Sequence, residues 1–473
     1  MPRRRIFCVA KDTNEIILVY LARQNQPMTA STDPHLLETE PIPKLLWKYA
    51  LPAIITTLTT SLYNLIDRVF IGQGAGAMAI SGLALSLPIM NLLQAFGTLI
   101  GVGASTRVSI VLGMHDRDWA ERILGNALIL TLIIWAFLSI FCLALLHPLL
   151  TTFGGSENTI PYAVNYLAII IPGYIFSNLA YSFCNIIRAS GAPGKSMTIM
   201  LVGVGVNLIL DPLFIFGFKM GIQGAAIATV LSMFATSIFT MYHFLRPGAY
   251  IRFTRSTLKL KKTIVRNILS IGMSPFLMNI AASVVAIILN SRLFKHGGDL
   301  AVGAYGIINS YGILFVMFVI GLCQGMQPIV GYNYGAKKLE RSKQTLYLSI
   351  KVGTLITAFG FLLLEIFPET AAKVFTTDKD LIAITKTGLR FVFLLFPFVG
   401  FQIVTSNFFQ SLGKVHLSIF LSLTRQVLFL IPALYICSGL WGLNGVWAAT
   451  PVADFFSILI TLVILQRQIK RLE

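Results

Sequence analysis

The chain has 473 residues, of which 56% are hydrophobic and only 12% are charged. This composition excludes an ordinary soluble protein, because about a quarter of the residues of such a protein are charged. The formal net charge of +18 does not indicate a nucleic-acid partner, because Lys and Arg gather in alternate short connectors between apolar runs. We therefore expect an all-α integral membrane protein.

The first 43 residues differ from the rest and are predicted to form an irregular cytoplasmic extension. Lys11, Asp12 and Glu15 interrupt the apolar stretch that a cleaved signal peptide needs. The apolar residues 16–22 are too few to cross a bilayer. An alternative is that translation begins at Met28, because the sequence from there resembles an ordinary start to a first membrane helix.

From residue 44 onward, long apolar runs alternate with short connectors. About 20 residues cross the hydrocarbon core as a helix, so the sequence predicts twelve transmembrane helices. Lys and Arg concentrate after the even-numbered spans, in the central linker 246–263 and in the tail 468–473, which predicts that both termini are cytoplasmic. The predicted spans cover residues 44–72, 77–106, 119–147, 160–187, 194–217, 221–245, 264–295, 301–330, 341–367, 381–412, 415–438 and 442–467.

The two halves of the chain repeat. A displacement of about 222 residues lays Gly103 over Gly325, and the segment GIQGAAIAT falls on GLNGVWAAT. An offset this steady across six spans indicates a duplication. Because six spans per copy give both copies one orientation, we expect an N-lobe over 44–245 and a C-lobe over 264–467, with a substrate cavity between them.

Asp67 and Asp211 lie inside apolar stretches, where a charged side chain costs several kcal/mol unless it faces a protein interior and binds or carries a cation. Counting from the outer helix ends puts both carboxylates level with Thr229, and Asn207 lies one turn from Asp211 on the same face. Oxygen ligands suit Na⁺, and a desolvated carboxylate suits a proton. These four residues are the predicted cation-coupling site, the alternative being that each polar group hydrogen-bonds locally.

Several further polar residues within spans have predicted roles. Tyr63 and Asn64 precede Asp67 by one helical turn and are expected to share its network. Arg425 and Asp454 are level on adjacent antiparallel helices, so we expect a buried ion pair in the C-lobe, with a structural role favoured over a substrate or gating role. Candidates to line a cavity, or alternatively to hold helices together, are Asn91, Gln94, Asn178 and Tyr181.

The segments LPAIITTLTTSLYNLIDRVFIGQGAG, GVGASTRVSIVLG and QPIVGYNYGAKK resemble the multidrug and toxic compound extrusion (MATE) family, and the likeness covers residues 44–467. The match looks closest to the DinF-like branch, whose members have an Asp in helix 1, Asn and Asp in helix 5, and a Thr in helix 6. The resemblance implies that the four residues above couple transport to a cation, and that Pro52 marks a hinge in helix 1. Spans 7 and 10 contain no acid, so a C-lobe cation site like that of the NorM-like branch is not expected.

Two further patterns carry little weight. SGAPGKS, at residues 190–196, resembles a P-loop but lacks its first glycine and lies between membrane spans, so we expect no ATP hydrolysis. The six histidines and five cysteines show no metal-ligand spacing, so no metal beyond Na⁺ is expected.

The sequence thus favours a multidrug efflux transporter without cofactors, which works as a monomer in the plasma or bacterial inner membrane. It would export amphipathic, cationic organic compounds in exchange for Na⁺ or H⁺. The nearest competing function is that of a lipid or lipid-linked oligosaccharide flippase of the same superfamily, although few basic residues besides Arg425 lie within spans. A membrane enzyme is disfavoured because the sequence shows no reactive His, Ser or Cys constellation. A channel-like relative would differ from an antiporter in lacking ion-dependent efflux.

Overall fold

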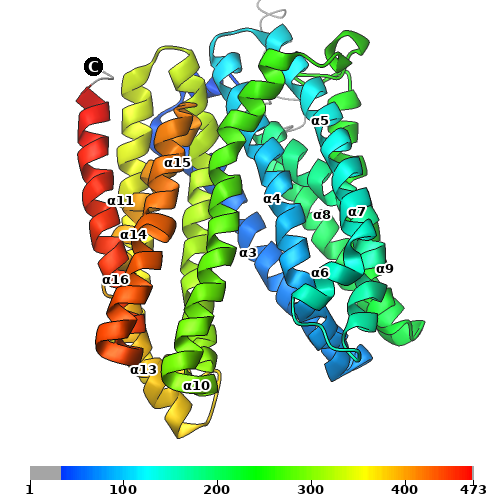
Figure 1. Cartoon of the computed structure of the whole chain (residues 1–473). Coiled ribbons are helices and arrows are strands. Elements are labelled where there is room, and N and C mark those ends of the chain that lie inside the picture. Colours follow the sequence, from blue (N-terminus) through cyan, green and yellow to red (C-terminus); the bar gives the residue numbers. More distant parts are fainter. Residues whose placement is uncertain (1–33, 471–473) are drawn as a thin grey trace, which may run out of the picture.

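The structure is a computed structural model that describes residues 34–470. Within this range every regular element is helical, as Figure 1 shows. The elements are α2 (Leu36–Thr39), α3 (Ile42–Ala75), α4 (Ala77–Gly113), α5 (Arg117–Ala144), α6 (Leu146–Thr152), α7 (Ile160–Ala189), α8 (Pro193–Pro212), η1 (Leu213–Gly217), α9 (Gly221–Leu245), η2 (Arg255–Leu258), α10 (Lys262–Gly335), α11 (Leu339–Ile366), α12 (Pro368–Lys373), α13 (Lys379–Phe393), α14 (Phe396–Ser411), α15 (Val415–Leu423), η3 (Thr424–Leu430) and α16 (Ile431–Lys470).

The helices account for twelve membrane spans in the described residues. Eight continuous helical stretches are long and apolar enough to cross a membrane, and α13 with α14 forms a further span bent by 49°. Two of the eight stretches each contain two spans, because α10 breaks at Gly298 (φ 63°) and the stretch from α15 to α16 breaks at Gly442 (φ 55°). The 34-residue helix α3 is the remaining span, so the predicted number is confirmed.

The hydrophobic core is shared between the lobes at one end of the molecule and divided at the opposite end. One cluster joins the lobes, with Leu45 and Ile123 from the N-lobe and Val330 and Phe408 from the C-lobe. A second cluster is confined to the N-lobe and a third to the C-lobe. In Figure 1 the lobes meet at the end where α16 finishes and diverge toward the opposite end. With the orientation predicted from the basic connectors, the lobes meet on the cytoplasmic side.

Close backbone contacts across this junction depend on two glycines that the repeat relates. A Cβ atom added to Gly103 on α4 would lie 2.0 Å from the carbonyl oxygen of Ile268 on α10. A Cβ atom added to Gly325 on α10 would lie 2.5 Å from the Cα atom of Ala50 on α3. Glycine is required at both positions because the facing atoms are backbone and cannot move aside.

Two terminal or linking segments differ from the sequence prediction. Residues 1–33, with the alternative start at Met28, lie outside the described residues. The prediction of an irregular extension is wrong for residues 34–43, which contain α2 and the start of α3, because Leu37 is buried in the shared core.

The linker 246–263 does more than set topology, because it is bound to α5. The Asn126 side chain donates to the Lys259 carbonyl (3.1 Å) and accepts from the Lys261 amide (2.7 Å). The linker therefore belongs structurally to the N-lobe, even though its basic residues also fit the positive-inside pattern.

Candidate cation-coupling site

Asp67 and Asp211 come together inside the N-lobe, far from the junction of the lobes. Asp67 lies near the end of α3 and is 8% exposed; Asp211 lies in the last turn of α8, before the π-helix η1, and is 1% exposed. Their carboxyl groups are close enough to interact electrostatically. Two neighbouring carboxyl groups repel each other when both are charged, so a shared proton or a bound cation would stabilise the pair.

The remaining two predicted site residues are also buried, Asn207 in contact with Asp211 and Thr229 in the wall of the same cavity as Asp67. Asn207 lies one helical turn before Asp211, and its Nδ2 atom donates to Asp211 Oδ1 at 3.2 Å. Thr229 on α9 is 2% exposed. Three buried oxygens have no hydrogen-bond partner, namely Asp67 Oδ1, Asn207 Oδ1 and Thr229 Oγ1. Because an unpartnered buried oxygen is costly, this donor set fits a hard cation such as Na⁺.

A cavity of about 540 Å³ lies next to the carboxyl pair. Its wall comes from the N-lobe helices, with Met317 and Gln324 added from α10. Asp67 and Thr229 line it, whereas Asn207 and Asp211 lie behind the wall. Asp67 therefore lines the cavity and also interacts with Asp211. The cavity is also lined by five more of the predicted residues, Tyr63, Asn64, Asn91, Gln94 and Tyr181.

Asn178 does not line this cavity, which corrects that part of the prediction. It is 4% exposed and packs against α4, where a Cβ atom added to Gly97 would lie 2.3 Å from its Oδ1 atom. The contact matches the alternative role of a residue that holds two helices together.

Sequence reasoning missed two tyrosines of α7 that line the cavity. Tyr166 lies near Asp67, and the Tyr174 hydroxyl donates to Gln94 Oε1 at 3.0 Å. Tyr166 and Tyr174 are two helical turns apart, and Tyr181 follows two turns later on the same face. This spacing was the signal that could have found them.

Two arginines in the cavity wall, both near span ends, were also missed. Arg68 follows Asp67 on α3. Arg188 is 5% exposed and donates to Asn185 Oδ1 (3.3 Å) and to Gln324 Oε1 (2.7 Å). The second contact joins α7 of the N-lobe to α10 of the C-lobe, so it closes the cavity at the end nearer the lobe junction.

Pro52 lies inside α3, fifteen residues before Asp67. Two threonines of the next turn bond back to the helix: Thr56 Oγ1 donates to the Pro52 carbonyl and Thr57 Oγ1 to the Ala53 carbonyl, both at 2.8 Å. Proline and back-bonded threonines both favour a bend in a helix. The role of Pro52 as a hinge stays a prediction.

The C-lobe holds a different arrangement of charges. Arg425 lies in the π-helix η3, and its Nε atom lies 2.5 Å from Asp454 Oδ1 on α16, where Asp454 is 1% exposed. In the alignment of the two repeats, Asn290 occupies the position equivalent to Asp67, and Ile431 occupies the position equivalent to Asp211. Neither carries a charge, so the carboxyl pair belongs to the N-lobe alone.

Twelve spans in two duplicated lobes, with a buried acidic site beside a cavity, define a membrane transporter fold. The MatE family model matches residues 52–213 and again residues 275–436, so the chain belongs to the MatE family of MATE transporters. The two matches also confirm the internal repeat, because they are displaced by nearly the predicted offset.

Curated relatives and solved structures agree with this assignment. "Multidrug export protein MepA" of Staphylococcus aureus (strain MSSA476) is 27% identical over 427 residues, which cover 90% of this chain and 94% of that protein. MepA of Staphylococcus haemolyticus (strain JCSC1435) is 27% identical over 88% of this chain and 92% of that protein.

Two solved structures show the shared fold. A structure described as the outward-facing conformation of a multidrug resistance MATE family transporter of the MOP superfamily superposes with a TM-score of 0.88 at 24% identity, over 95% of this chain and 100% of that chain. A MATE crystal structure in a bent conformation gives a TM-score of 0.87 at 26% identity, over 94% and 98% of the two chains. The branch within the family stays a prediction.

Proposed function

We propose that this chain is a secondary active exporter that moves small amphipathic organic cations out of the cell in exchange for Na⁺ or H⁺. Family membership and the multidrug-export relatives support drug transport. The observation that carries the coupling is the position of Asp67, which lies in the cavity wall while its carboxyl group meets Asp211 behind it. Both termini are proposed to be cytoplasmic, as the basic connectors indicate.

Asp67 gives a physical route for the exchange. Two unit charges 4 Å apart interact by about 4 kcal/mol at an effective dielectric constant of about 20. A Na⁺ or H⁺ bound at the carboxyl pair neutralises Asp67 and removes that attraction for a cationic drug in the cavity. A coupling of about 1–3 kcal/mol is enough for exchange, and it is reciprocal, so the drug also weakens binding of the cation.

The remaining lining residues suit an aromatic, cationic substrate. Four tyrosines, Tyr63, Tyr166, Tyr174 and Tyr181, line the cavity together with Asp67, and tyrosine rings bind cations through their faces. A cavity of about 540 Å³ is of the size that holds a drug-sized molecule.

The flippase alternative has one observation in its favour, because Arg68 and Arg188 in the cavity wall could bind a phosphate. Arg188 is already bound by Asn185 and Gln324, and the relatives are named for multidrug export, so the exporter is the stronger proposal. Translocation of a fluorescent phospholipid in proteoliposomes, without ethidium transport, is the result that would favour the flippase.

Neutralising either carboxyl group tests the proposed site. Asp67→Asn and Asp211→Asn are each expected to lower ethidium export from cells by at least about tenfold. Removing one charge of the pair changes the electrostatic interaction energy by more than about 1.4 kcal/mol, and about 1.4 kcal/mol corresponds to a factor of ten. Asp118→Asn, at an exposed acid of α5, is the matched control and is expected to export normally. Export at the parental rate by both site variants, at equal expression, would rule out the assignment.

A further inference from the structure

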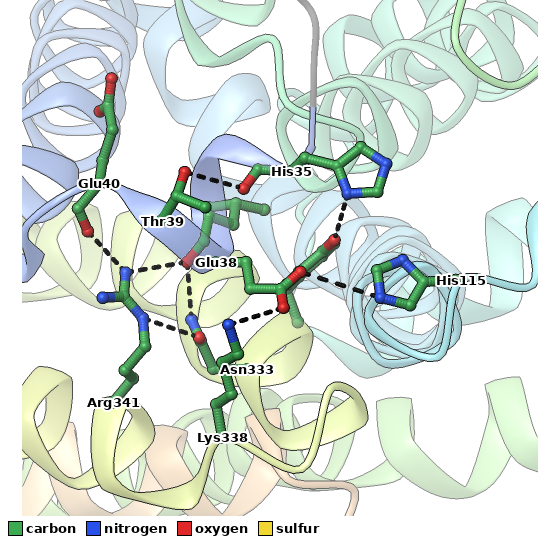
Figure 2. Close-up of polar contacts among 10 residues, drawn as sticks. His35, Glu38, Thr39, Glu40, His115, Asn333, Lys338 and Arg341 are labelled. Carbon is green, nitrogen blue, oxygen red and sulfur yellow. Dashed lines mark hydrogen bonds and ion pairs between the residues drawn. The ribbon is translucent and has the colours of Figure 1, made fainter. Parts of the chain in front are cut away.

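The short helix α2 lies where two connectors related by the repeat meet. One connector follows α4 and contains His115; its counterpart follows α10 and contains Lys337 and Lys338. His115 and Lys337 both have left-handed backbone conformations (φ 61° and 59°), as expected for equivalent turns at the ends of the two glycine-terminated helices. Glu38 of α2 lies between them, 3.8 Å from His115 Nε2 and 2.7 Å from Lys338 Nζ (Figure 2).

Contacts with the C-lobe hold α2 in this position. Leu37 is fully buried, and its carbonyl accepts from Asn333 Nδ2 (3.0 Å) and Arg341 Nη2 (3.2 Å). Arg341 Nη2 also donates to the Glu40 carbonyl at 2.6 Å. These bonds, drawn in Figure 2, fix the backbone on both sides of Glu38 to the C-lobe.

Three metal-ligating side chains converge at this point. The potential ligand atoms of His35, Glu38 and His115 all lie within 4.8 Å of one another. The two imidazole rings are stacked with centroids 5.3 Å apart, and the Tyr332 hydroxyl lies 3.4 Å from His35 Nδ1.

The surroundings of Glu38 leave part of its carboxyl group available to a metal. The Lys338 ammonium group lies 2.7 Å from Oε1 and forms an ion pair with it. Lys338 binds Oε1 and His115 approaches Oε2, so one oxygen remains directed toward the histidines. The His115 side chain is 54% exposed, which leaves a path for an ion from solution and room for the small rotation that metal distances of about 2 Å require.

We propose that His35, Glu38 and His115 form a binding site for a divalent transition metal ion such as Zn²⁺ at the junction of the lobes. Two histidines and one carboxylate are a donor set that Zn²⁺ accepts, with further positions open to water. A bound ion links α2, which is fixed to the C-lobe, to the N-lobe connector. The ion therefore holds the two lobes together on this side. Its effect on transport rests on the proposed function, because the lobes must separate at this junction during the transport cycle.

Direct binding of ZnCl₂ to the purified full-length chain, with any affinity tag removed, tests the site by titration calorimetry. His115→Asn keeps a residue that tolerates the left-handed backbone and removes the imidazole, so it is expected to weaken Zn²⁺ binding by at least about tenfold. Lys338→Met removes a positive charge beside the ligand and is expected to strengthen binding. His147→Asn, at an exposed histidine of α6, is the matched control and is expected to bind as the parent does.

Equal Zn²⁺ affinity in the parent and His115→Asn would overturn the site, whatever the chain transports. If the site binds, micromolar ZnCl₂ on the side of α2 is expected to inhibit ethidium transport in proteoliposomes for the parent but not for His115→Asn. Binding without inhibition would overturn the link between the lobes. Binding with no ethidium transport in the absence of ZnCl₂ would count against the proposed function and leave the metal site supported.

Discussion

Asp67 is the residue on which the functional account depends, because it is the member of the carboxyl pair that lines the cavity. Sequence reasoning proposed four residues for the cation site from their depth in the membrane, and all four are buried in the structure. It did not show which acid would line the cavity, because the direction of a side chain on a helix depends on how neighbouring helices pack. The same limit explains why Asn178 was misplaced and why Tyr166 and Tyr174 were missed.

The ion pair of the C-lobe gives a contrasting prediction at the residue scale. Asp454→Asn leaves Arg425 without its partner, and breaking a buried pair by removing one member costs about 3 kcal/mol. We expect the melting temperature of the purified protein to fall by several degrees. Cation dependence of export should persist, because the pair lies in the opposite lobe from Asp67.

Asp299→Asn is the control, since this C-lobe acid is exposed. An unchanged melting temperature together with lost export would contradict a structural role for the pair and point to a role in transport.

At the scale of elements, apolar run length predicted the helices well, because each span must bury about 20 apolar residues in the bilayer. The π-helices η1 and η3 were not predicted, although η1 directly follows Asp211 and Pro212 and η3 contains Arg425. Such segments are common at functional sites and depend on tertiary packing more than on local composition. The helix α2 was missed for a related reason, since its four residues form a helix only against the C-lobe.

Contact between helices at the lobe junction gives a prediction for Gly325. Gly325→Val places a side chain against the backbone of Ala50 on α3, so the lobes cannot meet as closely at that end. We expect an increase of several ångströms in the distance between spin labels placed on the two lobes at this end, and a severalfold loss of export.

Gly306→Val is the matched control, because it lies on the same helix and a Cβ atom there has no neighbour within 4 Å. Equal distances in the two variants would show that the glycine contact does not control closure.

At the scale of the whole molecule, the chain combines a symmetric scaffold with an asymmetric site. The repeat could be predicted from the sequence, and it accounts for the paired glycine contacts at Gly103 and Gly325. The asymmetry could be predicted as well, because Asn290 and Ile431 replace the two acids in the second copy. The cluster of His35 and His115 could not, since these residues are far apart in the sequence and only the folded junction brings them together.

The central claim is that an inward cation gradient drives export through the Asp67–Asp211 pair. The most direct measurement is ethidium movement in proteoliposomes under an imposed Na⁺ gradient or an imposed pH gradient, applied in turn. We predict that at least one gradient drives ethidium transport against its concentration in the parent and neither does so in Asp67→Asn. Transport that is indifferent to both gradients, or that persists unchanged in Asp67→Asn, would contradict the account.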